Sequence, residues 1–321
     1  MAVSENTLAP EVGFTQAWGV RGSWLPLFAA VTLVSGAAFA TEAPRTVFHF
    51  SASSTLFARP GVGRDGAIYV GSGDGYVHAL SPDGSFRWSY TVKGRVVAPP
   101  VEEPSSGRVF VATSEARLYA LEPDSHLRWV FPLPVAPKSE LSLTSKGTLL
   151  FVGQDDYLYG VTTGGALSLR LAATAARSAP VQLATGQTGV LLGEAFATVK
   201  GYGYERVALS GPFGPTAKLA IDAERAIFSC EEGTVRVLLS SGSSAFEAKS
   251  DCLSPPTRGD GFFAVAEAGG DVRLFYRDGT SFAIPLDAAP LRPLWDAARR
   301  RLVVSSATGS LTVLELAGGP G

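Results

Sequence analysis

DGAIYVGSGDGYVHALSPDGSFRWSYTV, residues 65–92, is followed by a second version of the same pattern, SGRVFVATSEARLYALEPDSHLRWVFPL, at residues 106–133. In each copy an alanine precedes a tryptophan by nine positions, and the two tryptophans, Trp88 and Trp129, lie 41 residues apart. A tandem repeat of this length is typical of solenoids and propellers.

Each copy reads as short strands separated by tight turns. Runs rich in Val, Ile, Tyr, Phe and Trp alternate in polarity with a period of two, at residues 67–70, 77–80 and 86–90. The turns between them are GSGDG and SPDG, in which glycine permits a positive φ and aspartate bonds the local backbone. The unit is therefore an antiparallel meander, and its period favours the blade of a β-propeller over a leucine-rich solenoid.

The second strand of each blade begins at a regular interval along the chain. Seven positions align, 36 to 41 residues apart: Ala67, Arg108, Thr148, Gly189, Ala226, Phe262 and Leu302. Prolines recur just before or within the expected first strands, where a missing N–H harms no ladder: Pro100, Pro137, Pro180, Pro215, Pro255 and Pro290. The sequence therefore predicts an all-β, seven-bladed propeller of four-stranded antiparallel blades.

Closure of the ring is expected to use both ends of the domain. The last copy supplies only three strands, at 291–295, 301–305 and 311–316, whereas residues 47–50 form an orphan strand before the first full copy. We predict that this N-terminal strand completes the last blade, since pairing it there protects an open sheet edge.

Residues 1–40 read as a targeting segment. Arg21 precedes an apolar run at 24–34, and an A-x-A sequence ends at Ala40. We predict a signal peptide cleaved after Ala40, a single propeller domain at 41–321, and a location in the periplasm or outside the cell. The run is short for a membrane span and contains Pro26. A membrane anchor, or a start codon assigned too far upstream, is the alternative.

The net charge and the distribution of hydrophobic residues argue against nucleic acid as a partner and against a further membrane-spanning segment. The formal net charge is −2, whereas nucleic-acid binding favours a strongly basic surface. No other hydrophobic stretch is long enough to cross a bilayer.

The repeat resembles a known propeller family. The resemblance is carried by Ala79, Leu80, Asp83, Gly84 and Trp88 in the first copy and by Ala120, Leu121, Asp124 and Trp129 in the second. These residues resemble the pyrroloquinoline-quinone-like propeller repeat of quinoprotein dehydrogenases and of the outer-membrane assembly lipoprotein of the barrel-assembly machinery. The resemblance implies that Trp88 and Trp129 pack between blades; an aromatic platform for a ligand is the alternative.

The resemblance does not extend to a cofactor. Quinone-dependent dehydrogenases of that family have eight blades, a vicinal disulfide and a calcium ion held by carboxylate and amide groups. Here the only cysteines are Cys230 and Cys252, and the only asparagine is Asn6, inside the predicted leader. We therefore expect no cofactor. The predicted cleavage site also lacks the cysteine of a lipoprotein.

Motifs for chemistry are absent or have a structural interpretation. A GxGxxG match at 61–66 leads into a strand, so we interpret it as a turn and not as a dinucleotide site. GxSxG, CxxC and HExxH are missing. The three histidines, His49, His78 and His126, are expected on edge strands or turns without a carboxylate partner. We predict no catalytic or metal site, although carboxylates from different blades could still converge.

The two cysteines suit an exported protein. Cys230 ends the second strand of the fifth blade, and Cys252 lies in the connection that leaves its fourth strand. In an antiparallel meander these two ends share one face. A disulfide is therefore reasonable, and two free buried thiols are the alternative.

A ligand site, if present, is expected at the central channel, where the first strands converge. Six charged residues lie on or beside these strands: Arg59, Glu102, Arg177, Lys218, Arg258 and Arg292. We interpret them as solvated channel or rim charges, with ligand binding as the alternative.

Together these observations predict a monomeric, exported, non-enzymatic propeller that acts as a scaffold for an envelope protein partner. The alternatives are a propeller that binds a small molecule or sugar, a hydrolase, and a quinone-dependent dehydrogenase.

Overall fold

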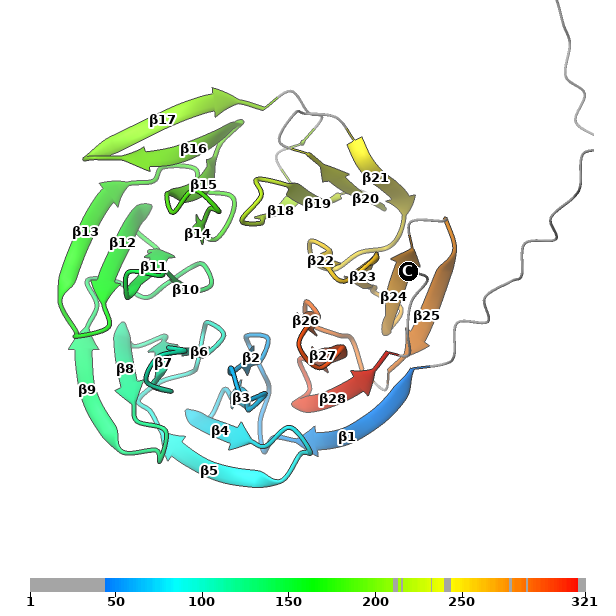
Figure 1. Cartoon of the computed structure of the whole chain (residues 1–321), viewed down its shortest axis with the longest axis horizontal. Coiled ribbons are helices and arrows are strands. Elements are labelled where there is room, and N and C mark those ends of the chain that lie inside the picture. Colours follow the sequence, from blue (N-terminus) through cyan, green and yellow to red (C-terminus); the bar gives the residue numbers. More distant parts are fainter. Residues whose placement is uncertain are drawn as a thin grey trace, which may run out of the picture. The chain divides into compact units, whose positions relative to one another are not determined.

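A computed structural model describes residues 44–316, except 210–212, 215, 232, 240–243, 277–278 and 287. Within these residues 28 strands form seven four-stranded antiparallel sheets, which are arranged in a ring as the blades of a propeller (Figure 1). The predicted seven-bladed propeller is confirmed. The predicted leader and Pro215 lie outside the described residues. No helix in the part of the chain that the structure describes could cross a membrane.

The first three blades follow one another along the chain. Blade 1 contains β2 (Gly61–Val62), β3 (Ile68–Gly71), β4 (Tyr76–Leu80) and β5 (Phe86–Thr91). Blade 2 contains β6 (Val101–Glu102), β7 (Val109–Thr113), β8 (Arg117–Leu121) and β9 (Leu127–Pro132). Blade 3 contains β10 (Ser142–Leu143), β11 (Thr148–Val152), β12 (Tyr157–Thr162) and β13 (Leu167–Ala172).

The next three blades have the same order. Blade 4 contains β14 (Val181–Gln182), β15 (Thr188–Leu192), β16 (Ala195–Lys200) and β17 (Gly203–Ala208). Blade 5 contains β18 (Lys218–Ile221), β19 (Ile227–Glu231), β20 (Thr234–Leu238) and β21 (Ser244–Lys249). Blade 6 contains β22 (Thr257–Arg258), β23 (Phe262–Ala266), β24 (Asp271–Tyr276) and β25 (Ser281–Pro285). The observed second strands begin within one residue of the seven positions aligned in the sequence.

Blade 7 is built from both ends of the domain. It contains β26 (Leu294–Asp296), β27 (Arg301–Ser305), β28 (Ser310–Glu315) and, as its outer strand, β1 (Arg45–Ser51). The strand β1 pairs antiparallel with β28, from Arg45 opposite Glu315 to Ser51 opposite Ser310. The predicted closure is confirmed, and Figure 1 shows β1 beside β28 at the rim.

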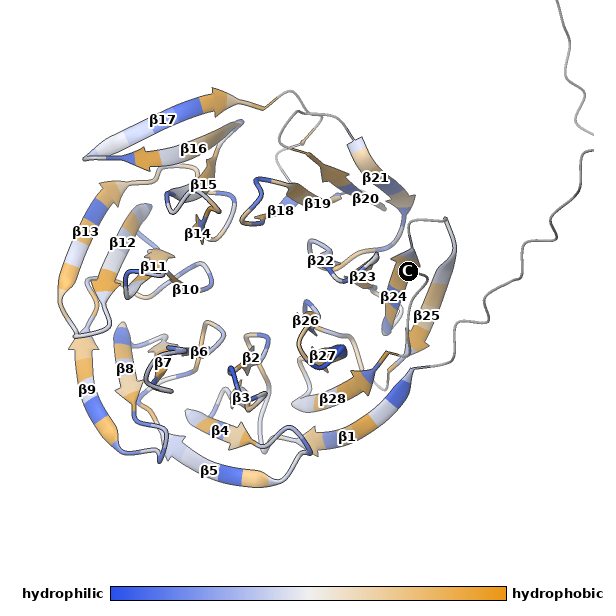
Figure 2. Ribbon diagram, viewed as in Figure 1, coloured by the Kyte–Doolittle hydropathy of each residue, from blue (hydrophilic) through white to orange (hydrophobic). Residues whose placement is uncertain are grey.

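Burial differs between the middle and the outer strands. All five residues of β7, VFVAT, are buried, because neighbouring blades cover both faces of this strand. The outer strand β5, FRWSYT, alternates between exposed and half-buried residues. Figure 2 shows the same contrast between the hydrophobic β8 and the alternating β9.

The hydrophobic core lies between the blades. Phe110 and Leu118 of blade 2 pack against Leu149 and Phe151 of blade 3, and all four side chains have 0% exposure. Comparable clusters fill the other six interfaces. Burying one such side chain stabilises the fold by about 1.5–3 kcal/mol, so each blade depends on its neighbours.

Trp88 and Trp129 each reach from an outer strand to the next blade. The indole N–H of Trp88 donates to the carbonyl oxygen of Pro123, 2.9 Å away in the β8–β9 turn of blade 2. The indole N–H of Trp129 donates to the carbonyl oxygen of Thr163, 3.3 Å away in the β12–β13 turn of blade 3. Both rings are half-buried and contact the interblade clusters.

The GxGxxG stretch forms the β2–β3 turn, as predicted. The N–H of Gly66 donates to the carbonyl oxygen of Gly63 at 2.9 Å, and Gly66 has a φ of +84°. A Cβ atom on Gly61 would lie 1.9 Å from the carbonyl oxygen of Pro100 in blade 2. Glycine is required at this position because neighbouring innermost strands approach closely.

The expectation for the histidines holds in full only for His49, because His78 is not on an edge strand and the Nδ1 of His126 lies 3.0 Å from a carboxylate oxygen of Asp124. His49 lies on the outer strand β1 and His126 in the β8–β9 turn, but His78 lies on β4, the third strand of its blade. There its ring stacks on Tyr76 with centroids 5.9 Å apart, and burial lowers its pKa. The prediction of an edge strand is wrong because β4 pairs with β3 on one side and with β5 on the other, and the ring of His78 lies 5.6 Å from that of Phe50 on β1.

Candidate functional site: the central channel

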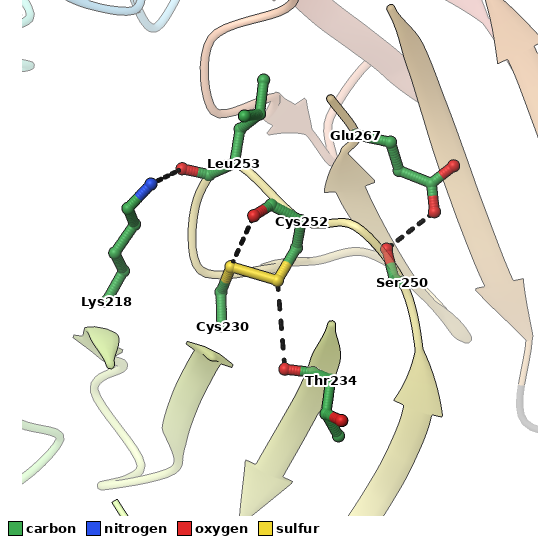
Figure 3. Close-up of a disulfide and its surroundings, with 7 residues drawn as sticks. All are labelled: Lys218, Cys230, Thr234, Ser250, Cys252, Leu253 and Glu267. Atoms are coloured by element: carbon green, nitrogen blue, oxygen red, sulfur yellow. Dashed lines mark hydrogen bonds between the residues drawn. A yellow bond between two sulfur atoms is a disulfide. The ribbon is translucent and has the colours of Figure 1, made fainter. Parts of the chain in front are cut away.

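The six charged residues singled out in the sequence all lie on or just before innermost strands. Three of them, Glu102, Lys218 and Arg258, link adjacent blades and do not line the cavity that the other three share. The amine of Lys218 donates to the carbonyl oxygen of Leu253 at 2.7 Å (Figure 3). The guanidinium of Arg258 on blade 6 lies 3.1 Å from a carboxylate oxygen of Asp222 and 2.7 Å from one of Glu224, both in blade 5.

Glu102 is the third of these linking residues. Its carboxylate accepts hydrogen bonds from the hydroxyl of Tyr69 at 2.6 Å and from the N–H of Arg64 at 2.9 Å, both in blade 1. Burial, followed by the hydrogen bond to Glu102, raises the pKa of the Tyr69 hydroxyl. Glu102 therefore joins blade 2 to blade 1.

The other three residues, Arg59, Arg177 and Arg292, line one cavity of about 600 Å³. Segments of blades 1, 3, 4, 5, 6 and 7 contribute to its wall. Further polar residues of the lining are Lys138, Ser139, Glu140, Ser142, Ser178 and Ser254. We refer to this space as the channel cavity.

Arg59 and Glu140 form the central ion pair of the channel cavity. The Nε and one Nη of Arg59 each donate to a different carboxylate oxygen of Glu140, both at 2.8 Å. Burial raises the pKa of Glu140, but the charge of Arg59 and these hydrogen bonds outweigh burial and lower the pKa to about 2. Glu140 is therefore ionised at neutral pH, and the bidentate geometry fixes both side chains.

Arg59, Glu140 and Arg292 occupy equivalent places in the fold. Each stands two residues before the innermost strand of its blade, in blades 1, 3 and 7 respectively. The ring therefore places two guanidinium groups and one carboxylate at the same level of the channel. The pair Arg59–Glu140 spans blade 2, whose equivalent residue is Pro99.

Arg292 is the least paired of these groups. One Nη donates to the carbonyl oxygen of Pro256 at 3.4 Å, and its Nε has no hydrogen-bond partner among the described residues. Burial lowers the pKa of Arg292 to about 10, with the charge of Glu140 opposing this shift and that of Arg59 adding to it. The guanidinium of Arg292 thus stays charged at neutral pH, in a site that disfavours its charge.

Arg177 and Lys138 add positive charge at the cavity wall. Arg177 donates to the carbonyl oxygens of Gly214 and, at 3.2 Å, Ala217. Lys138 pairs with Asp156 of the β11–β12 turn.

Sequence reasoning missed Glu140, Lys138 and Ser254. The repeat does place Glu140 at the position equivalent to Arg59, and an alignment of the residues preceding each first strand would have selected it. No sequence pattern points to Ser254, which is notable only because its hydroxyl is buried without a hydrogen-bond partner among the described residues.

Cys230 and Cys252 form a disulfide, with Cα atoms 5.9 Å apart (Figure 3). Cys230 lies on β19, and Cys252 lies in the segment that leads from β21 to β22. The bond therefore ties the second strand of blade 5 to the start of blade 6, next to the hydrogen bond from Lys218 to Leu253.

The residues of the channel cavity do not fit a quinone cofactor with calcium. Among the described residues, its lining contains one carboxylate, Glu140, which is already bound by Arg59. The two cysteines lie 22 residues apart, so they are not vicinal. Within the described ranges no group of three or more His, Cys, Asp or Glu side chains could hold a metal ion.

The fold and the repeat define the chain as a propeller of the pyrroloquinoline-quinone-like class. A family profile described as outer membrane protein assembly factor BamB matches residues 29–200, more than half of the chain. The chain therefore belongs to this family, and the resemblance seen in the sequence is confirmed.

A solved structure supports the fold at low sequence identity. The crystal structure of BamB from Moraxella catarrhalis matches with a TM-score of 0.58 and 19% identity, over 85% of this chain and 86% of that one. No curated protein matches the chain.

Proposed function

We propose that this protein is an exported, non-enzymatic propeller that acts as a protein-interaction scaffold in the cell envelope. Membership in the BamB family supports this proposal, because the name of that family describes a factor in the assembly of outer membrane proteins. The observation that carries it is a row of exposed hydrophobic side chains at one end of the outer strands.

The row repeats from blade to blade. Phe86, Leu127 and Leu167 are each the first residue of the outer strand, in blades 1, 2 and 3, with 61%, 45% and 45% exposure. Tyr202, 97% exposed, continues it in the β16–β17 turn of blade 4. We call these four residues the outer-rim row. Exposed apolar side chains that recur at the same end of neighbouring outer strands favour contact with a protein partner.

The inner charges support a rigid disc. Arg59, Lys218 and Arg258 each bind a residue of another blade, so they hold the ring together. A disc of this kind presents its rim without rearrangement, and a preorganised surface loses little freedom on binding.

Export is supported by two features of the chain. The A-x-A sequence ending at Ala40 matches a signal-peptidase site. The disulfide between Cys230 and Cys252 suits an oxidising compartment.

Site-directed photocrosslinking tests the scaffold proposal. A photoreactive residue is placed at Leu127 or Leu167, and the matched control at Val207, which is 58% exposed on the outer strand β17 but at its other end. We expect one envelope protein to be crosslinked from positions 127 and 167 and not from 207. With the photoreactive residue at position 167, substituting Phe86→Ser and Leu127→Ser together should abolish capture while leaving the melting temperature within a few degrees.

Two results would count against the proposal. Equal crosslinking from 207 would show that the outer-rim row has no special role. An intact apolar leader on the protein purified from cells, shown by amino-terminal sequencing, would contradict the predicted cleavage.

A further inference from the structure

The channel cavity has an excess of positive charge. Its described lining carries four cationic side chains and one carboxylate: Arg59, Lys138, Arg177 and Arg292 against Glu140. Glu140 neutralises Arg59, and Asp156 neutralises Lys138. Among the described residues, Arg177 donates hydrogen bonds to the carbonyl oxygens of Gly214 and Ala217, and Arg292 donates one to the carbonyl oxygen of Pro256. Two guanidinium groups at the cavity wall are therefore not bound by any carboxylate among the described residues.

The same wall contains two polar atoms without a partner. The Nε of Arg292 and the Oγ of Ser254 are buried and have no hydrogen-bond partner among the residues that the structure describes. Leaving a buried donor unpaired costs about 1–3 kcal/mol, and more when the group is charged. Both residues line the channel cavity, so an oxyanion bound to the other N–H groups of Arg292 would offset part of the cost of burying this incompletely paired guanidinium.

We propose that the channel cavity binds a small organic oxyanion, a molecule that bears a carboxylate or phosphate group, with Arg292 as its principal ligand. A planar guanidinium suits bidentate recognition of either group. The cavity volume of about 600 Å³ lies in the range of small-molecule sites. This inference is independent of the scaffold function, which rests on the outer rim.

Glu140 has a defined effect in this arrangement. By holding Arg59 through two hydrogen bonds it removes one guanidinium from the site and places a negative charge beside Arg292. A bound oxyanion would compete with this carboxylate. Removing the charge of Arg292 and removing that of Glu140 should therefore change anion affinity in opposite directions.

Isothermal titration calorimetry of the propeller domain, at low ionic strength, tests the site. Succinate and inorganic phosphate serve as probes and distinguish carboxylate from phosphate recognition, and glycerol serves as the neutral control. We expect at least one anion to bind and the variant Arg292→Gln to weaken it at least tenfold. The variant Arg258→Gln removes an arginine that is paired with Asp222 and Glu224, outside the cavity, and should leave the affinity within twofold.

The variant Glu140→Gln supplies the opposite result. It should tighten binding of the same anion severalfold, whereas loss of a structural ion pair alone would not increase affinity. Circular dichroism melts establish that each variant is folded. If Arg292→Gln does not fold, Arg292→Lys replaces it in the titration. The proposal is overturned if neither anion binds at millimolar concentration. It is also overturned if Arg258→Gln weakens binding as much as Arg292→Gln does.

Discussion

Phe48 on the outer strand of blade 7 packs directly against Gly84 in the β4–β5 turn of blade 1. A Cβ atom on Gly84 would lie 2.5 Å from the ring of Phe48. Trp129 of blade 2 has the same relationship to Gly165 of blade 3, where a Cβ would lie 3.2 Å from the indole. The aromatic ring that joins blade to blade within the repeat is therefore replaced by Phe48 at the point of closure.

Truncation of these aromatic rings should destabilise the propeller. Replacing a large core side chain with alanine costs about 3–5 kcal/mol, and we expect Trp129→Ala to fall near 3 kcal/mol because its ring is half-buried. Trp129→Phe should cost less, since it retains an aromatic ring beside Gly165 and loses the hydrogen bond to Thr163 and part of the buried ring area. Urea denaturation measures both; equal losses for the two variants would contradict a packing role.

Removal of the N-terminal strand should prevent closure. Deleting residues 41–52 removes β1 and leaves the edge of β28 unpaired. We expect this variant to unfold or aggregate, as exposed sheet edges do, whereas a chain lacking only residues 2–40 should melt as the complete domain does. Size-exclusion chromatography and thermal melting distinguish them, and an unchanged melting temperature after the longer deletion would refute this role of β1.

The disulfide gives a direct chemical prediction. Thiol titration of the denatured, unreduced protein should find no free thiol, because the chain has only Cys230 and Cys252. Closing a loop of this size stabilises the fold by about 3 kcal/mol in the chain-entropy estimate. The variant Cys230→Ser with Cys252→Ser should lose a comparable amount in urea denaturation. Detection of two thiols per chain would show that the bond is absent.

Close approach of the innermost strands makes Gly61 sensitive to substitution. The variant Gly61→Ala places a methyl group against the carbonyl oxygen of Pro100, and overpacking of this kind costs about 1–3 kcal/mol. Gly269→Ala is the matched control, because a Cβ there meets nothing within 4 Å. Similar urea midpoints for the two variants would mean that the β2–β6 contact tolerates a side chain.

Acid should weaken the channel ion pair. The pKa of Glu140 is about 2 in the folded protein against an ordinary value of 4.5, so its contribution to stability is complete above about pH 4.5 and is lost as the pH falls towards 2. The free energy of unfolding of Glu140→Gln should fall less steeply over this window than that of the unsubstituted protein. Glu205→Gln, an exposed control, should follow the unsubstituted protein. Parallel profiles for all three would contradict the assignment.

The fold was largely predictable because the sequence features that specify it are local and recur in each blade. The turn residues and the period of about forty specify strands such as β3 and β7, and the orphan strand before blade 1 specifies the closure. The channel cavity was not predictable in the same way. Arg59 and Glu140 are 81 residues apart and meet only because the ring curves around blade 2. The sequence indicates which residues precede the first strands, but not which of them bond across the channel.

The pairing of β1 with β28 also sets the order of events during synthesis. Arg45 and Glu315, which pair across these strands, are separated by 270 residues, so the earliest strand of the domain waits for the last one. Six blades can form progressively as the chain emerges, but β1, the outer strand of the seventh blade, has no partner until β28 has been synthesised. The ring can therefore close only after β28, its last strand, has been synthesised.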